Sequence, residues 1–288
     1  MEFVLLGDPV GHSLSPAIHR AAFEAWGIAV RYRLRRVEAD GLAAAVREAA
    51  RGGGGNVTLP HKQAVATLIE EPMPDLLETG ACNCFWMTSE GRLAGDNTDV
   101  AGFLAALDEL AAPGDGAAPD VPAAPVSDGR VLVLGAGGAA RAVVVALGRL
   151  GVASVDLWNR TPENARRLVA ELKRGPGSVP IRALDRRPRD GGYALVVNAT
   201  RLGLDASDPL PIELEDGVAQ SVFDLVYGSG GTPWVRRAAG LGIPACDGLI
   251  MLVHQAARSL QRWFPDREPR ISVMLEAARA AADAATGA

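Results

Sequence analysis

Lysine is rare in this chain, and one of its two lysines is a candidate for proton transfer. Of the 29 basic residues, only Lys62 and Lys173 are lysines, and the others are arginines. A guanidinium does not release its proton in a protein, whereas a lysine ammonium can do so once it is removed from water. A basic residue that exchanges a proton would therefore have to be a lysine. We take Lys62 as the candidate and interpret Lys173 as a surface residue.

Two pairs of polar residues, together with the carboxylate of Asp99, are candidates for a small-molecule site. Ser13 and Ser15 are two residues apart, as are Asn56 and Thr58, so in extended backbone both members of a pair point the same way. Two hydroxyls beside the positive end of a helix can hold a carboxylate. Ordinary alternatives remain open. Ser15 can be a helix N-cap and Asp99 a first-turn acid, whereas Asn56 and Thr58 can form the polar face of an edge strand.

A glycine-rich sequence indicates a dinucleotide site. It reads Gly135-Ala136-Gly137-Gly138-Ala139-Ala140, follows a predicted buried strand at 131–134 and opens a predicted helix at 138–150. These glycines allow a tight turn and close backbone approach, so amide groups and the helix dipole can face a pyrophosphate. The alternative is a packing turn that merely requires small residues.

The residues after the next predicted strand favour NADP over NAD. Asp156 lies 21 positions after Gly135, near the spacing of an acid that binds the NAD ribose. It falls inside a predicted strand at 154–158, however, so we interpret it as a structural or exposed residue. The strand ends at Asn159-Arg160-Thr161, and the planar fork of an arginine suits a ribose 2′-phosphate. Arg160 as an ordinary surface arginine is the alternative.

The elements that would position these residues alternate between strands and helices, which predicts a largely parallel α/β fold. Predicted strands cover 3–6, 30–34, 56–59, 193–197, 218–226 and 243–246, with a hairpin at 81–87 and 92–94. Predicted helices cover 15–26, with Ser15 as N-cap, a helix capped by Asp40 that ends near 51, 99–110, 248–263 and 271–285. The polar sequences at 198–200 and 224–227 follow strands, where ligands of open α/β sheets bind. The Ala-, Pro- and Gly-rich stretch at 111–129 is typical of a linker or insertion.

Composition excludes several classes of protein. The 288 residues carry a net charge of -5, which gives no electrostatic footprint for nucleic acid. The longest apolar runs, 131–140 and 142–148, are separated by Arg141, so no membrane span is expected. The N-terminus lacks a basic leader, and the three cysteines form no disulfide framework, so we expect a cytoplasmic protein. Cys82 and Cys84 lack partner ligands, and no metal site is predicted.

Six motifs occur in an order that resembles the shikimate dehydrogenase family over nearly the whole chain. They are Gly7-Asp8-Pro9-Val10-Gly11-His12-Ser13-Leu14-Ser15-Pro16, Asn56-Val57-Thr58-Leu59-Pro60-His61-Lys62, Gly95-Asp96-Asn97-Thr98-Asp99-Val100-Ala101-Gly102, the glycine turn, Asn159-Arg160-Thr161, and Gly248-Leu249-Ile250-Met251-Leu252-Val253-His254-Gln255-Ala256. The resemblance implies reversible, NADP-linked reduction of 3-dehydroshikimate to shikimate, in the pathway to chorismate and the aromatic amino acids.

The resemblance also implies an architecture and a role for each matched residue. It implies an N-terminal mixed α/β substrate domain (1–102 plus 247–288), a Rossmann-type NADP-binding domain (103–246), and C-terminal helices packed back on the first domain. Lys62 and Asp99 would be the catalytic pair. Ser13 and Ser15 would bind the substrate carboxylate, and Asn56, Thr58, Asn83, Asp99, Tyr227 and Gln255 would surround the ring hydroxyls. Gly135, Ala136, Gly137, Gly138 and Ala139 would hold the pyrophosphate, Asn159, Arg160 and Thr161 the 2′-phosphate, and Thr200, Leu225, Gly248 and Met251 would lie near the nicotinamide.

Three positions depart from the usual family pattern and leave the substrate open. They are Arg20, Cys84 and Arg201, which flank the expected cleft rather than the catalytic pair. The first alternative is therefore a paralogue that acts on quinate or an aminoshikimate, with NAD bound through Asp156. A second alternative is a catalytically silent NADP-binding regulator, which the presence of both Lys62 and Asp99 disfavours. Monomer and homodimer both remain open.

Overall fold

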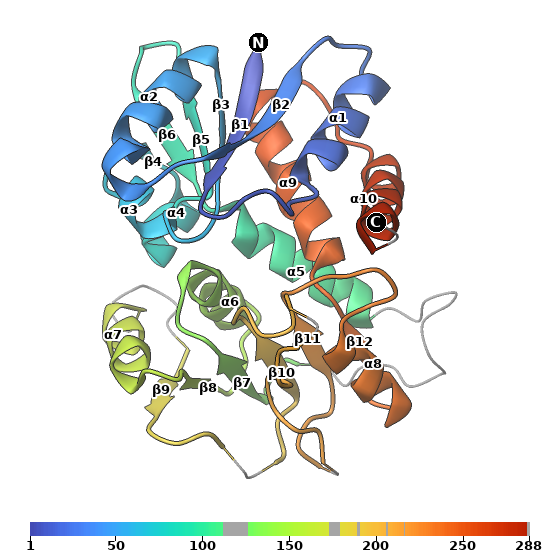
Figure 1. Ribbon diagram of the computed structural model, residues 1–288. Coiled ribbons are helices and arrows are strands. Elements are labelled where there is room, and N and C mark those ends of the chain that lie inside the picture. The colour runs from blue at the N-terminus through green and yellow to red at the C-terminus, as the bar shows by residue number, and fades with distance from the viewer. Residues whose placement is uncertain (112–125, 173–178, 189–190, 206, 216, 287–288) are drawn as a thin grey trace. The chain divides into compact units, whose positions relative to one another are not determined.

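The computed structural model describes residues 1–111, 126–172, 179–188, 191–205, 207–215 and 217–286 (Figure 1). The chain divides into two compact units. The first comprises Met1–Gly102 and Leu252–Ala288, and the second comprises Phe103–Met251. Most of the predicted linker at 111–129, and Lys173, lie outside the described residues.

The first unit contains a mixed six-stranded sheet in the order β2-β1-β3-β5-β6-β4. Its strands are β1 (Glu2–Gly7), β2 (Arg31–Arg36), β3 (Gly53–Val57), β4 (Glu71–Pro72), β5 (Cys84–Met87) and β6 (Leu93–Asp96). Strand β1 pairs in parallel with β2 and β3, and β4 pairs in parallel with β6. Strand β5 is antiparallel to both β3 and β6, which confirms the predicted hairpin.

Helices from both ends of the chain belong to the first unit. They are α1 (Ser15–Ala25), the short η1 (Ala39–Gly41), α2 (Leu42–Gly52), α3 (Lys62–Ala66), α4 (Pro74–Thr79) and α10 (Ile271–Thr286). Helix α5 (Thr98–Ala111) begins in this unit, and α9 (Leu249–Trp263) ends in it. Helix α10 packs against α1 (Figure 1), and the ring of Trp263 stacks on Phe3 at 4.2 Å between centroids. The C-terminal helices therefore pack back on the first domain, as predicted.

Two predicted helix caps are wrong. The N-cap of α1 is Leu14, and Ser15 is the first helical residue. Pro16 has no N–H group, so the first turn has one donor fewer for a cap to satisfy. Asp40 lies inside η1, and α2 begins after Gly41 without a side-chain cap.

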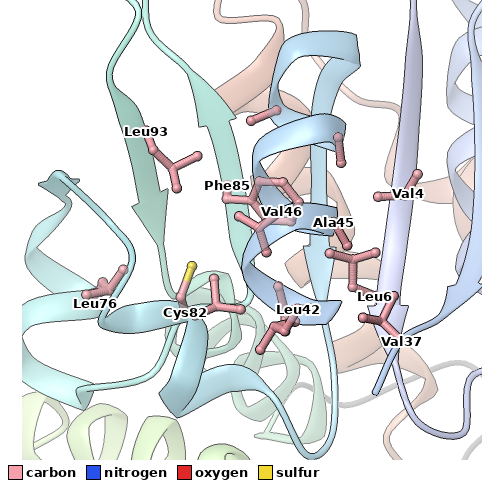
Figure 2. Packing of buried hydrophobic residues seen from close by; sticks show 14 residues of the cluster. Val4, Leu6, Val37, Leu42, Ala45, Val46, Leu76, Cys82, Phe85 and Leu93 are labelled. Atoms are coloured by element: carbon pink, nitrogen blue, oxygen red, sulfur yellow. The ribbon is translucent and has the colours of Figure 1, made fainter. Parts of the chain in front are cut away.

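The core of the first unit lies between α2 and the sheet. Figure 2 shows Leu42, Ala45 and Val46 of α2 beside Val4 and Leu6 of β1 and Phe85 of β5, all buried in one cluster. Strand β3 begins at Gly53, whereas the predicted strand begins at Asn56. The reason is close packing, because a Cβ on Gly54 would lie 2.4 Å from the carbonyl oxygen of Phe85.

The second unit has an all-parallel sheet in the order β9-β8-β7-β10-β11-β12, which is the doubly wound Rossmann order. Its strands are β7 (Arg130–Leu134), β8 (Ser154–Trp158), β9 (Ile181–Leu184), β10 (Leu195–Asn198), β11 (Val222–Asp224) and β12 (Ala245–Cys246). Its helices include α6 (Gly138–Arg149), α7 (Pro162–Leu172) and α8 (Pro233–Gly240). The strand order reverses between β7 and β10, and ligands of such sheets bind at this switch point.

Three further observations bear on the classes of protein considered above. Within the described ranges, no helix is long and apolar enough to cross a membrane. The same ranges contain no group of three or more His, Cys, Asp or Glu side chains arranged to hold a metal ion. Cys82 and Cys84 are buried, and burial raises the pKa of the Cys82 thiol to about 12, so this thiol stays protonated.

Candidate active site

Lys62 and Asp99 form an ion pair in the first unit. Lys62 is the first residue of α3, and Asp99 lies in the first turn of α5. The ammonium Nζ donates to Oδ2 of Asp99 at 2.5 Å, and the two side chains are 13% and 7% exposed. The pair is thus largely shielded from water while Nζ keeps donor capacity beyond the carboxylate.

Asn83 fixes the other carboxylate oxygen of this pair. Its Nδ2 donates to Oδ1 of Asp99 at 2.7 Å, and its Oδ1 accepts from the backbone N–H of Thr98 at 2.7 Å. The same amide group lies 3.4 Å from Oε1 of Gln255, on α9. Three of the predicted site residues are therefore joined to Lys62 through hydrogen bonds within one unit.

Asn56, near the end of β3, is held by Asn83 and by two residues that were not predicted from the sequence, Tyr32 and Ser259. Its Nδ2 donates to the carbonyl of Asn83 at 3.0 Å and to Oγ of Ser259 at 2.9 Å. Its Oδ1 accepts from the hydroxyl of Tyr32 at 2.8 Å. Ser259 lies one helical turn after Gln255, so the i,i+4 spacing was a usable signal. Tyr32 carried no such signal, apart from its place on the less polar side of a strand that alternates with arginines.

The two serines of the first motif lie together. Oγ of Ser13 donates to Oγ of Ser15 at 3.1 Å, and Ser15 is buried. Beside them, Nδ1–H of His19 donates to the carbonyl of Ser15 at 2.8 Å, and its ring stacks on Tyr32 at 4.0 Å. Burial lowers the pKa of His19 to about 4, so this ring is neutral at neutral pH. Thr58 is half-buried just after β3.

The glycine turn joins β7 to α6 at the switch point of the second sheet. Gly135 has φ +109°, and a Cβ there would lie 2.7 Å from the carbonyl oxygen of Ala199, so glycine is required. A Cβ on Gly137 would meet nothing within 4 Å, and the residue is exposed. Ala136 and Ala139 are half-buried, and Gly138 is buried. The N-terminus of α6 therefore presents open backbone to an anion.

The end of β8 separates Asp156, the candidate for binding NAD, from Arg160, the candidate for binding NADP. Asp156 is buried and accepts two hydrogen bonds from Arg182, at 2.6 and 3.0 Å, and one from Tyr193 at 2.9 Å. Burial alone would raise the pKa of Asp156, but these donors outweigh it and lower the pKa. Asp156 is thus structural and not exposed. Arg160 is exposed just after the strand, where Nδ2 of Asn159 donates to the carbonyl of Thr161 at 2.9 Å.

The remaining predicted cofactor residues cluster at the ends of β10 and β11. Oγ1 of Thr200 donates to Oδ1 of Asn198 at 2.6 Å, and N–H of Leu225 donates to the Asn198 carbonyl at 2.9 Å. A Cβ on Gly248 would lie 2.2 Å from the carbonyl oxygen of Leu225, so this approach also requires glycine. Met251 is buried in α9. Tyr227, half-buried, belongs to this second unit, unlike the other predicted substrate residues.

Known proteins of one family match this chain over both of its units. The substrate-binding domain model of shikimate dehydrogenase matches residues 5–85, and the shikimate 5′-dehydrogenase C-terminal domain model matches residues 248–279. The shikimate dehydrogenase (NADP(+)) of Methylocella silvestris is 40% identical over 274 residues, covering 93% of this chain and 91% of that protein. The fold is that of a two-domain oxidoreductase with a Rossmann-type unit. More particularly, the chain belongs to the shikimate dehydrogenase family, which confirms the resemblance.

Solved structures show the same architecture. The shikimate 5-dehydrogenase of Thermus thermophilus, in complex with NADP(H) and shikimate, has a TM-score of 0.80 and 36% identity, covering 98% of this chain and 99% of that one. The 5-ketofructose reductase of Gluconobacter sp. strain CHM43 has a TM-score of 0.80 and 29% identity, covering 97% and 98%. This fold therefore occurs in enzymes named for different substrates.

Proposed function

We propose that this chain catalyses the reversible, NADP-dependent reduction of 3-dehydroshikimate to shikimate. The observation that carries the proposal is the shielded pair of Lys62 and Asp99, held by Asn83 in a unit matched by the substrate-binding domain model. Relatives named shikimate dehydrogenase (NADP(+)) cover more than 90% of the chain at up to 40% identity, which supports the substrate and the cofactor.

Lys62 serves as the general acid–base in this proposal. When NADPH is bound, the ring carbonyl carbon would receive a hydride from it, and the ketone oxygen would have to gain a proton. The ammonium of Lys62 gives that proton in the reducing direction and takes it back in the oxidising direction. Asp99, itself fixed by Asn83, orients the ammonium and accepts a hydrogen bond from a substrate hydroxyl. Partial exclusion of water strengthens these interactions.

Most of the groups proposed to bind the carboxylate and hydroxyls of the substrate lie in the first unit, whereas Tyr227 lies in the second. We assign the paired hydroxyls of Ser13 and Ser15 to the carboxylate, beside the positive end of α1. The ring hydroxyls would be bound by the remaining polar side chains, namely Asn56, Thr58, Asn83, Asp99, Tyr227 and Gln255. Asn56 already uses both amide hydrogens on Asn83 and Ser259, so it would act toward a substrate hydroxyl as an acceptor.

The second unit fits NADP. The open backbone at Gly137 and the N-terminus of α6 suit the pyrophosphate, and Arg160 with Asn159 and Thr161 suits the 2′-phosphate. Thr200, Leu225, Gly248 and Met251 are assigned to the nicotinamide side. In this assignment residues 1–102 plus 247–288 form the substrate-binding catalytic domain and 103–246 form the cofactor domain. We place the reaction in the cytoplasm, carried out by a monomer or homodimer.

The test follows nicotinamide absorbance with purified protein, crossing shikimate and quinate with NADP and NAD. We expect turnover of shikimate with NADP and little turnover in the other three combinations. Preference for quinate or NAD would replace the proposed substrate or cofactor and move the protein to a paralogous activity. Binding of NADP without turnover of either acid would contradict the proposed reaction and favour a regulator.

A further inference from the structure

A buried polar network joins the ends of β10 and β11 in the second unit. Asn198 and Asp224 are register partners at the carboxyl ends of these parallel strands, and both are fully buried. Nδ2 of Asn198 donates to Oδ1 of Asp224 at 2.7 Å. Oγ1 of Thr232, the N-cap of α8, donates to Oδ2 of Asp224 at 2.7 Å.

The network holds the two segments that follow these strands. On one side, Oδ1 of Asn198 accepts from both the N–H and the hydroxyl of Thr200, at 3.1 and 2.6 Å. On the other side, Oδ1 of Asp224 accepts from the N–H of Val226 at 3.1 Å. Leu225 lies between these anchors. The carboxylate of Asp224 therefore fixes one segment directly and the other through Asn198.

We propose that Asp224 is a positioning residue for the nicotinamide end of the cofactor, acting through Asn198 and Val226 on the segments that carry Thr200 and Leu225. This inference rests on the proposed function, because those segments are assigned to the nicotinamide side there. The pyrophosphate turn and Arg160 follow β7 and β8. Gly135 of the turn packs against the Ala199 carbonyl, but the hydrogen bonds of the network described above do not extend to the turn or to Arg160. Loss of Asp224 should consequently weaken binding of the nicotinamide end of the cofactor and leave binding of its pyrophosphate and 2′-phosphate largely unchanged.

The charge of Asp224 matters because three donors converge on its carboxylate. A neutral carboxyl carries a hydrogen on one oxygen and offers these donors less acceptor capacity. Burial raises the pKa of Asp224 to about 6, and the nearby carboxylate of Asp247 adds to this, whereas the hydrogen bonds from Thr232, Val226 and Asn198 lower it. The thiol of Cys246, on the neighbouring strand β12, has a pKa raised well above its ordinary value by burial. Acid should therefore loosen the network.

The first experiment compares two ligands that differ only by the nicotinamide. Dissociation constants are measured at pH 8 for NADPH and for 2′-phospho-ADP-ribose. In Asp224→Ala we expect the Kd of NADPH to rise on the order of tenfold, because buried donors lose their acceptor. The Kd of 2′-phospho-ADP-ribose should stay within about twofold. Asp224→Asn keeps one acceptor for Asn198 and Val226, so it should restore the NADPH Kd to within about threefold of wild type.

Asp156→Asn is the matched control. It changes a buried aspartate of the same sheet whose donors, Arg182 and Tyr193, take no part in the network. We expect a lower melting temperature and unchanged Kd values for both ligands. If Asp224→Ala moves both Kd values in parallel, or moves neither, Asp224 is merely structural and the inference is overturned.

The second readout is pH. Both ligands carry the same phosphates, so their own titration cancels in the ratio of the two Kd values. In wild type the ratio of NADPH Kd to 2′-phospho-ADP-ribose Kd should rise as pH falls through about 6, and in Asp224→Asn it should stay flat. A flat wild-type ratio would overturn the inference. Binding needs no shikimate, so a protein that binds NADPH but does not turn over shikimate refutes the proposed reaction alone. A protein that binds no NADPH refutes the proposed cofactor and this inference together.

Discussion

Replacing Lys62 by arginine and by alanine separates its charge from its ability to release a proton. Arginine can keep the ion pair with Asp99, which is 2.5 Å long in the native protein. It cannot give up its proton, however, and alanine removes both the charge and the proton. If Lys62 transfers a proton, both variants should lose turnover. If it only supplies positive charge, arginine should preserve turnover.

The expected loss of activity is large and the expected loss of stability is small. Removal of a general acid–base lowers turnover by about 10²–10⁴, which corresponds to about 2.7–5.4 kcal/mol in the activation free energy. In Lys62→Ala the carboxylate of Asp99 keeps the hydrogen bond from Asn83 at 2.7 Å. The pair is also partly open to solvent, at 13% and 7% exposure, so water can replace the ammonium. We expect destabilisation of roughly 1–2 kcal/mol for alanine and less for arginine.

The assay is steady-state reduction of 3-dehydroshikimate with NADPH, accompanied by urea unfolding and an NADPH titration for each variant. Both variants should show kcat reduced at least 100-fold, with the Kd of NADPH within about twofold of wild type. Lys62→Arg with more than a tenth of wild-type kcat would refute proton transfer by Lys62. A near-normal kcat in Lys62→Ala would show that Lys62 has no role in catalysis.

Three other predictions address the cofactor site, the glycine turn and a buried histidine. Arg160→Ala should raise the KM of NADP on the order of tenfold or more and change the KM of NAD less than twofold, because only NADP carries the 2′-phosphate; equal changes would contradict the assignment. Gly135→Ala should destabilise the protein by roughly 2–4 kcal/mol in urea unfolding, since φ is +109° and the new Cβ would lie 2.7 Å from the Ala199 carbonyl oxygen, whereas Gly137→Ala, with open space around its Cβ, should cost little. Burial lowers the pKa of His19 from 6.5 to about 4. As the pH falls from 6.5 to 4, the unfolded chain therefore takes up a proton that the folded chain does not, and the free energy of unfolding should fall by up to about 3 kcal/mol. His19→Gln should show a shallower fall over that range, and an equal slope would refute the neutral histidine.

The sequence predicted the architecture well because its periodic signals were strong. The strand at 154–158 was predicted with the bounds of β8, and the glycine turn lies between β7 and α6 as expected. The predicted boundaries of strands were wrong where close backbone packing outweighed the local sequence signal. Gly53 and Gly54 belong to β3 because the neighbouring strand comes so close, although glycine is usually unfavourable in a strand.

The i,i+4 spacing from Gln255 places Ser259 on the same face of α9, but which residues distant in the sequence contact each other could not be predicted from composition or spacing. Tyr32 and Ser259 meet at Asn56 from positions 24 and 203 residues away, and no local pattern encodes such a contact. The same holds for Asp224, whose role depends on the register between β10 and β11. Only the family resemblance implied a role for Asn83, yet Asn83 donates to the carboxylate oxygen of Asp99 that Lys62 does not use.

Helices α9 and α10 follow the Rossmann-type unit in the sequence, which has a consequence for the order of assembly during translation. Residues 103–251 form their own compact unit and leave the ribosome before the last 37 residues of the first unit. The Rossmann-type unit can therefore fold while the first unit still lacks Gln255, Ser259 and the ion pair from Arg262 to Asp96, 2.7 Å long. Until those residues emerge, the Asp96 carboxylate of β6 lacks its ion pair with Arg262, and Asn56 lacks the hydroxyl of Ser259 as an acceptor. A nascent or truncated chain would hence be expected to bind the dinucleotide before it could bind shikimate.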